Sequence, residues 1–173
     1  PALPVLDPEG MIQHLARVSD WVIADAESRT TLESLMGQLM WDFGGGLLVL
    51  FQGELEEGGV KFVVASDPDW LPCAEDLLEQ ISDWDARHNG GSPRAASSQQ
   101  ERRQLKEALF RGSLGEEDAW ICVHRYQALE RPYFLAVALP QFDPETWNPV
   151  PALRALGDQL ILGLVHHVGH YEP

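Results

Sequence analysis

The sequence predicts an α+β fold, in which helices pack on the faces of an antiparallel sheet. Short apolar runs suited to strands occur in two neighbouring pairs, each joined by turn residues, and such pairs form hairpins. Amphipathic helical stretches precede, separate and follow these pairs. The order is helix, helix, hairpin, helix, helix, hairpin, helix, which is typical of an α+β domain. The 173 residues suit a single domain spanning 1–173.

Two N-terminal helices are expected within residues 8–41. Asp7 can cap the first, and Pro8 suits its first turn because proline's fixed φ is already helical. Apolar residues then recur at helical spacing, namely Met11, Leu15, Val18 and Val22. Thr30 and Glu33 form a capping box that opens the second helix. Three glycines at 44–46 end this helix.

The sheet is expected within residues 47–139, with helices over 72–88 and 98–111 between its two hairpins. The first hairpin pairs residues 47–51 with 60–65 across a glycine- and glutamate-rich turn. The second hairpin pairs 119–127 with 133–139 across a short turn.

A C-terminal helix is expected over 151–170 because leucines recur there at helical spacing. We expect it to lead into an output domain that this chain does not contain. The chain begins at Pro1 without an initiator methionine, so we expect either a piece of a longer cytoplasmic protein or a processed protein.

The charge of the chain argues against two classes of partner. With 12 basic and 27 acidic residues, the net charge is 12 − 27 = −15. Nucleic-acid binders need a basic face that displaces counterions, and anionic membranes attract basic segments. No apolar run is long enough to span a membrane. We therefore expect neither nucleic-acid nor membrane contact.

Three segments resemble the GAF family of small-molecule-sensing domains. Residues 31–36 leading into 45–50 resemble the family's second helix entering its first strand, and 60–67 resemble its second strand. Residues 132–139, 142–145 and 153–160 resemble its last strand, its acidic turn and its closing helix. The resemblance covers about residues 10–168, while residues 86–118, where the family builds its ligand lid, match no family pattern.

The resemblance implies a regulatory domain of a larger signalling protein, such as a histidine kinase of a two-component system, a cyclic-dinucleotide enzyme or a transcription regulator. It implies an unidentified small-molecule ligand and no catalysis by the domain itself. The family's signatures for bilin and cyclic-nucleotide binding are missing. His88 or His124 could hold a haem, but a lone histidine is more often an ordinary structural residue. We therefore expect no cofactor.

A candidate ligand-binding face lies on strand 119–127. Successive side chains of a strand alternate between its two faces, so one face is aliphatic apart from Arg125, and the other mixes aromatic and hydrogen-bonding groups. Such a mixed face suits a ligand pocket, although a face simply covered by helices remains the alternative. Two tryptophans near helix 72–88 are expected to close the pocket. The predicted ligand-binding residues are Trp70, Trp84, Trp120, Cys122, His124 and Tyr126.

The terminal helices predict a homodimer. Both have apolar residues left over once one face is assigned to the sheet, and such broadly apolar helices either lie deep in a core or pair with another subunit. The interface is expected to be of a parallel type. The predicted interface residues are Ile12, Val22, Ile161, Leu162 and Val165.

No catalytic motif is present in the sequence, which leaves two alternatives to a sensor. One is a GAF-type thiol reductase using Cys73 and Cys122, and the other is a ligand-free dimerisation module. His166 and His170 have a spacing that can chelate a metal, and His167 lies between them. A solvated helix end, with histidines near the negative end of the helix dipole, explains them better, so no metal is expected.

Overall fold

The computed structural model describes residues 6–24, 29–52, 59–68, 94–95, 120–143 and 145–166. It confirms the predicted α+β class. The antiparallel sheet has the order β2-β1-β5-β4-β3. Its strands are β1 Leu47–Gln52, β2 Gly59–Ala65, β3 Arg94–Ala95, β4 Trp120–Ala128 and β5 Arg131–Leu139.

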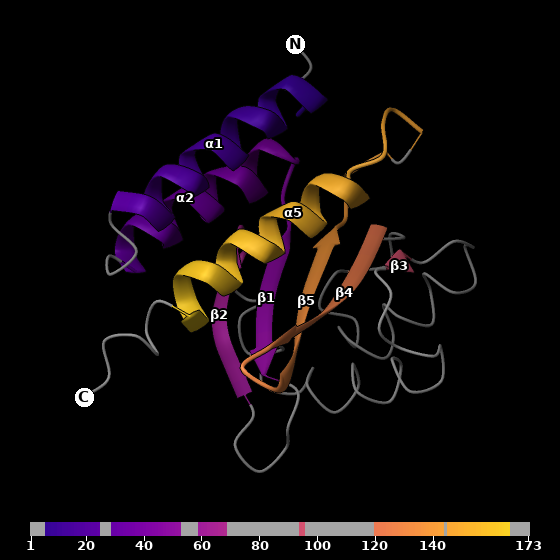
Figure 1. The fold of residues 1–173 in the computed structure, drawn as a ribbon. Coiled ribbons are helices and arrows are strands. Elements are labelled where there is room, and N and C mark those ends of the chain that lie inside the picture. The colour runs from indigo at the N-terminus through magenta and orange to yellow at the C-terminus, as the bar shows by residue number, and fades with distance from the viewer. Residues whose placement is uncertain are drawn as a thin grey trace.

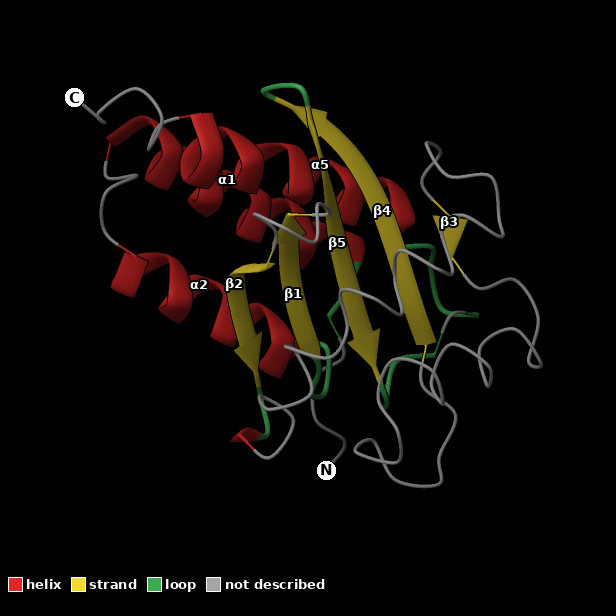
Figure 2. Ribbon diagram, turned by 90° about the horizontal axis from the view of Figure 1, so that it is seen from below, coloured by secondary structure: helices red, strands yellow, loops and turns green. Residues whose placement is uncertain are grey.

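Three helices cover one face of this sheet, which we call the first face (Figures 1 and 2). They are α1 Pro8–Ala24, α2 Arg29–Asp42 and α5 Val150–Ile161. A π-helical turn, Leu162–His166, continues α5. Leucines of α5, the apolar stripes of α1 and α2, and alternate residues of β1, β4 and β5 form one hydrophobic core. None of the described helices is long and apolar enough to cross a membrane.

The start of α1 is fixed by several polar contacts. The Asp7 carboxylate accepts a hydrogen bond from the Gly10 amide at 2.7 Å, which satisfies one free N–H of the first turn. One turn later, His14 Nε2 lies 2.8 Å from the Asp42 carboxylate at the end of α2. The Trp147 indole donates to the Leu6 carbonyl at 2.9 Å, so the loop before α5 also holds the N-terminal segment.

Two glycines allow α5 and its π-helical turn to lie close to their neighbours. A Cβ placed on Gly157 would overlap the ring of Tyr126, and one on Gly163 would overlap the ring of Trp21. Gln159 of α5 donates to the Ser19 hydroxyl of α1 at 2.8 Å. These contacts set α1 and α5 side by side and running in the same direction (Figure 1).

The β4–β5 hairpin turns through two residues with positive φ, Leu129 at 51° and Glu130 at 64°. Two-residue turns of this kind favour asparagine followed by glycine, because other side chains are strained there. We expect the double substitution Leu129→Asn and Glu130→Gly to stabilise the protein by about 1 kcal/mol. Urea denaturation of the two proteins would measure this gain, and an unchanged midpoint would contradict it.

Several expected features lie outside the described residues. These are the helices 72–88 and 98–111, the lid region 86–118 apart from β3, Trp70, Trp84, Cys73, His88, and the end of the C-terminal helix with His167 and His170.

Candidate ligand-binding site

The four described residues predicted to bind a ligand all lie on the first face, beneath the helices. Trp120, Cys122, His124 and Tyr126 are each at most 8% exposed. They pair across the ladder with Leu139, Val137, Leu135 and Tyr133 of β5. Cys122 and Tyr126 belong to the hydrophobic core with the α5 leucines, and Trp120 makes an edge contact with the Phe142 ring, their centroids 5.7 Å apart.

The described neighbours of these residues are α5 and the loop before it. Helix 72–88, which we expected to close a pocket over them, lies outside the described residues. The mixed chemistry of the face has a structural cause. The Tyr126 hydroxyl donates to the Arg154 carbonyl of α5 at 2.9 Å, so a polar tip that suggested a ligand contact is satisfied by a helix backbone.

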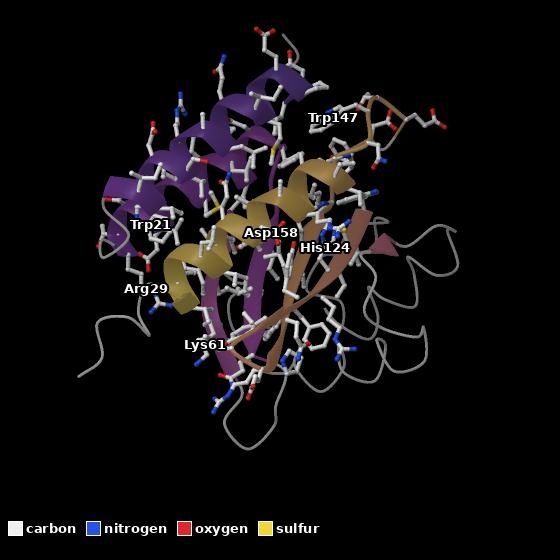
Figure 3. All side chains as sticks on the ribbon, viewed as in Figure 1. Trp21, Arg29, Lys61, His124, Trp147 and Asp158 are labelled. Carbon is white, nitrogen blue, oxygen red and sulfur yellow. The ribbon has the colours of Figure 1, made fainter. Side chains whose placement is uncertain are left out.

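His124 is the most unusual polar residue of the first face. It is fully buried, and its Nδ1 lies 3.3 Å from the Tyr126 hydroxyl (Figure 3). The Tyr126 hydroxyl donates its proton to the Arg154 carbonyl, so in its contact with His124 it can only accept, and Nδ1 must be the protonated ring nitrogen. In the neutral ring Nε2 is then a buried acceptor without a hydrogen-bond partner. Burial, and secondarily the positive charge of Arg154, lower the pKa of His124 to about 4. The imidazole is therefore neutral near pH 7.

Cys122 is a poor nucleophile in this environment. Its side chain is 1% exposed, and burial raises the pKa of its thiol far above the usual range. The thiolate is the reactive form of cysteine, so a buried thiol of this kind is inert. Within the described part of the chain, no group of three or more metal-ligating side chains is close enough to hold a metal ion.

The opposite face of the sheet, which we call the second face, has a different composition. The strand alternation and the ladder register place on it the residues that alternate with those of the first face. Those of β1, β5 and β4 are apolar except for Arg125 and, near the end of β4, the exposed Gln127. The apolar ones are Leu47, Val49, Phe51, Pro132, Phe134, Ala136, Ala138, Ile121 and Val123.

Of these apolar residues of β1, β4 and β5, all but Pro132 are withdrawn from water, none of them being more than 4% exposed. Yet α1, α2 and α5 all lie across the sheet from them (Figure 2). Arg125, opposite Phe134 in the ladder and half-buried, is the one charged residue that β1, β4 and β5 place on this face. An apolar surface with a few polar groups at its margin has the composition of a small-molecule site.

Sequence reasoning missed the second face, although a signal for it exists. All five residues from Leu47 to Phe51 are apolar, and a strand with no polar side lies between two covered faces. The mixed residues of β4 suggested a ligand more strongly than the aliphatic ones, and so the first face was predicted instead.

The predicted dimer-interface residues divide into two groups. Ile12 and Leu162 are 65% and 52% exposed, and Val22 is half-buried. Ile161 and Val165 are instead buried in the hydrophobic core of the chain, so they are unavailable to a partner. The π-helical turn explains Val165: it holds more residues per turn than an α-helix, so the inward position after Leu160 moves from Leu164 to Val165.

Comparison with known proteins shows the fold class. No protein-family model matches the sequence. No curated protein matches it significantly. Among solved structures, the chain is similar to the N-acylhomoserine lactone dependent LuxR family transcription factor CepR2 from Burkholderia cenocepacia, with a TM-score of 0.54 and 10% identity. The match covers 91% of this chain and 98% of that chain, so the two share an overall fold.

Proposed function

We propose that this chain is a sensory, ligand-binding regulatory domain of the GAF type, and that its ligand lies against the second face of the sheet. The observation that carries the proposal is the composition of a sheet face on the side away from α1, α2 and α5, where a continuous group of apolar side chains is bordered by Arg125. The shared fold with a lactone-dependent regulator supports the same function.

The second face favours a ligand with an apolar body. Ala136 lies at the centre of this face, opposite Val49 of β1 and Val123 of β4, so the side chains at the centre are small. An acyl chain or a comparable hydrocarbon would gain about 0.8 kcal/mol for each buried methylene. Arg125 at the margin suits a polar or anionic head group on the same molecule.

In this proposal the helical layer transmits the signal. Ligand binding would bias the packing of the sheet against α1 and α5 in a cytoplasmic homodimer, and a two-state shift there would pass to an output domain. The output domain would be that of a histidine kinase, a cyclic-dinucleotide enzyme or a transcription regulator.

Thermal denaturation with N-acylhomoserine lactones of several chain lengths tests the ligand proposal. Fatty acids of equal chain length separate the contribution of the head group. We expect at least one of these compounds to raise the Tm in proportion to the logarithm of its concentration above Kd. No shift from any of them would favour a ligand-free dimerisation module instead.

The substitution Ala136→Leu locates the site. If ligand occupies the space beside Ala136, leucine fills that space, abolishes the Tm shift and leaves the unliganded protein folded. If the second face is a tightly packed core, the larger side chain destabilises the unliganded protein by about 1–3 kcal/mol. Ser34→Leu, which adds leucine on the exposed side of α2, is the matched control and should leave the shift unchanged.

A further inference from the structure

The strands of the sheet differ in charge from the rest of the chain. The protein has 27 acidic and 12 basic residues, yet the five described strands contain no aspartate or glutamate. They contain four basic residues, Lys61, Arg94, Arg125 and Arg131. The sheet is therefore a locally positive part of a strongly negative protein, and an anion is attracted to it although the chain as a whole repels anions.

Two of these arginines belong to the second face. Arg125 alternates with the first-face residues of β4 and is half-buried. Arg94 of β3 is opposite Val123 in the ladder, and residues opposite each other in a ladder belong to the same face of a sheet. Arg131, by contrast, is opposite Ala128, which belongs to the first face. The β3–β4 edge of the second face thus has two arginine positions.

The ladder register brings these two positions close together. Arg94 is opposite Val123, and Arg125 follows Val123 by two residues on β4, so the two arginines are diagonal neighbours. Diagonal neighbours in an antiparallel ladder are about 7–8 Å apart, within reach of long side chains. Two positive charges at this separation repel each other, and an anion bound between them offsets that repulsion.

The row of the ladder that contains Arg94 continues across the apolar part of the second face. Arg94, Val123, Ala136, Val49 and Val63 are opposite one another in turn, on β3, β4, β5, β1 and β2. Neighbouring strands lie about 4.8 Å apart, so the four apolar members of this row extend about 14 Å from β4 to β2. A hydrocarbon chain along this row would have its polar end at the two arginines.

The sequence around β3 is also basic. Residues 86–115 contain six of the 12 basic residues of the chain and two of the acidic ones, so their net charge is 6 − 2 = +4. The rest of the chain has a net charge of −15 − 4 = −19. β3 lies within this basic stretch and pairs with β4 at the edge of the sheet (Figure 2). Positive charge is therefore concentrated in the part of the sequence that borders the second face.

We propose that the ligand of the second face is an anionic amphiphile. Its carboxylate or phosphate is held by Arg94 and Arg125 at the β3–β4 edge, and its hydrocarbon tail lies along the apolar row toward β2. Arginine presents a planar fork of N–H donors that matches the oxygens of a carboxylate or phosphate. A homoserine lactone ring is uncharged, so it would leave the repulsion between the two arginines in place. This inference rests on the proposed ligand site and adds the charge of the head group.

Compounds with tails of equal length and different head groups test this charge. Dodecanoate and dodecyl phosphate are anionic, whereas methyl dodecanoate and N-dodecanoyl homoserine lactone are neutral. Isothermal titration calorimetry of the unaltered protein, below the critical micelle concentration of each compound, measures Kd and stoichiometry. We expect one anion per chain, bound about 10- to 100-fold more tightly than the neutral compounds, because hydrogen bonds to charged groups are the stronger ones. Added salt should weaken the binding of the anions only.

Substitutions of single arginines locate the head group. Arg125→Gln and Arg94→Gln should each raise the Kd of dodecanoate about 10-fold or more and leave the Kd of methyl dodecanoate unchanged. Arg131→Gln removes the same charge from the first face and is the matched control, so it should bind dodecanoate as the unaltered protein does. Circular dichroism should show the three variants equally folded.

The possible results separate this inference from the proposal on which it rests. If the neutral compounds bind as tightly as dodecanoate, or if Arg131→Gln weakens dodecanoate as much as Arg125→Gln does, the anionic head group at this edge is wrong and the ligand site on the second face stands. If none of the four compounds binds, or if Ala136→Leu leaves the Kd of dodecanoate unchanged, the ligand site itself is overturned and the inference with it.

Discussion

Replacing Gly157 with alanine is expected to destabilise the protein by about 3 kcal/mol, the upper part of the range for overpacked cores. A Cβ at this position would overlap the hydroxyl and ring of Tyr126. The ring cannot retreat, because it is held between α5 and the sheet, with its hydroxyl donating to the Arg154 carbonyl. Alanine therefore moves α5 outward, and the core beneath its leucines opens.

Gly37→Ala is the matched control for this prediction. It makes the same substitution within a helix, but a Cβ on Gly37 would lie 3.8 Å from Val64, an ordinary contact. Alanine favours the helix over glycine, so this variant should gain about 1 kcal/mol. Denaturant midpoints of the two variants should thus move in opposite directions. Equal and small effects would show that α5 does not lie as close to β4 as the structure places it.

The elements of the described fold could be predicted from local patterns. The apolar run from Leu47 to Phe51, bounded by glycines, predicted a short strand, and the structure shows β1 inside the sheet. The spacing of Leu153, Leu156 and Leu160 identified the buried side of α5, and all three are in the core. These features depend on residues a few positions apart.

The assignment of the two sheet faces could not be predicted in this way. Alternation along β4 separates two sets of side chains, but it does not say which set lies under a helix. That depends on contacts such as the one from Tyr126 to Arg154, which are 28 residues apart. In the sequence, a tyrosine whose hydroxyl meets a helix carbonyl looks the same as a tyrosine that contacts a ligand.

The exposed side of the terminal helices was predictable in part, for a related reason. The sequence marked these helices as too apolar for a single buried face, and Ile12 and Leu162 are exposed. It did not reveal that α5 ends in a π-helical turn, which brings Val165 inward. Nor did it reveal that Ser19 pairs with Gln159, which determines the part of α1 that borders α5. The exact set of exposed residues therefore required the structure.

The second large effect expected is a loss of stability in acid that depends on His124. Its folded-state pKa, about 4, lies below the unfolded value of 6.5, so the unfolded chain binds the extra proton throughout the interval between them. Stability is therefore complete above pH 6.5 and falls as the pH is lowered toward 4. A pKa difference of one between the folded and unfolded states corresponds to about 1.36 kcal/mol, so this histidine accounts for a loss of about 3 kcal/mol over that window.

The physical cause lies in the surroundings of the ring. Protonation would put a charge on a fully buried imidazole whose Nε2 has no partner, between a core tyrosine and the positively charged Arg154. His124→Leu should remove the dependence and hold its stability between pH 6.5 and 4 better than the unaltered protein does. At pH 7 it should be about as stable, because it also removes an unsatisfied polar atom.

Tyr126→Phe separates this titration from the loss of a hydrogen bond. The variant keeps the buried imidazole but loses the hydroxyl that meets Nδ1 and the Arg154 carbonyl. It should lower the free energy of unfolding by about 1 kcal/mol at every pH and leave the slope between pH 6.5 and 4 in place. Urea denaturation of the unaltered protein, His124→Leu and Tyr126→Phe at half-unit pH steps would measure these differences in the free energy of unfolding. If His124→Leu keeps the slope of the unaltered protein, the acid sensitivity arises elsewhere, and the burial of His124 under α5 does not control it.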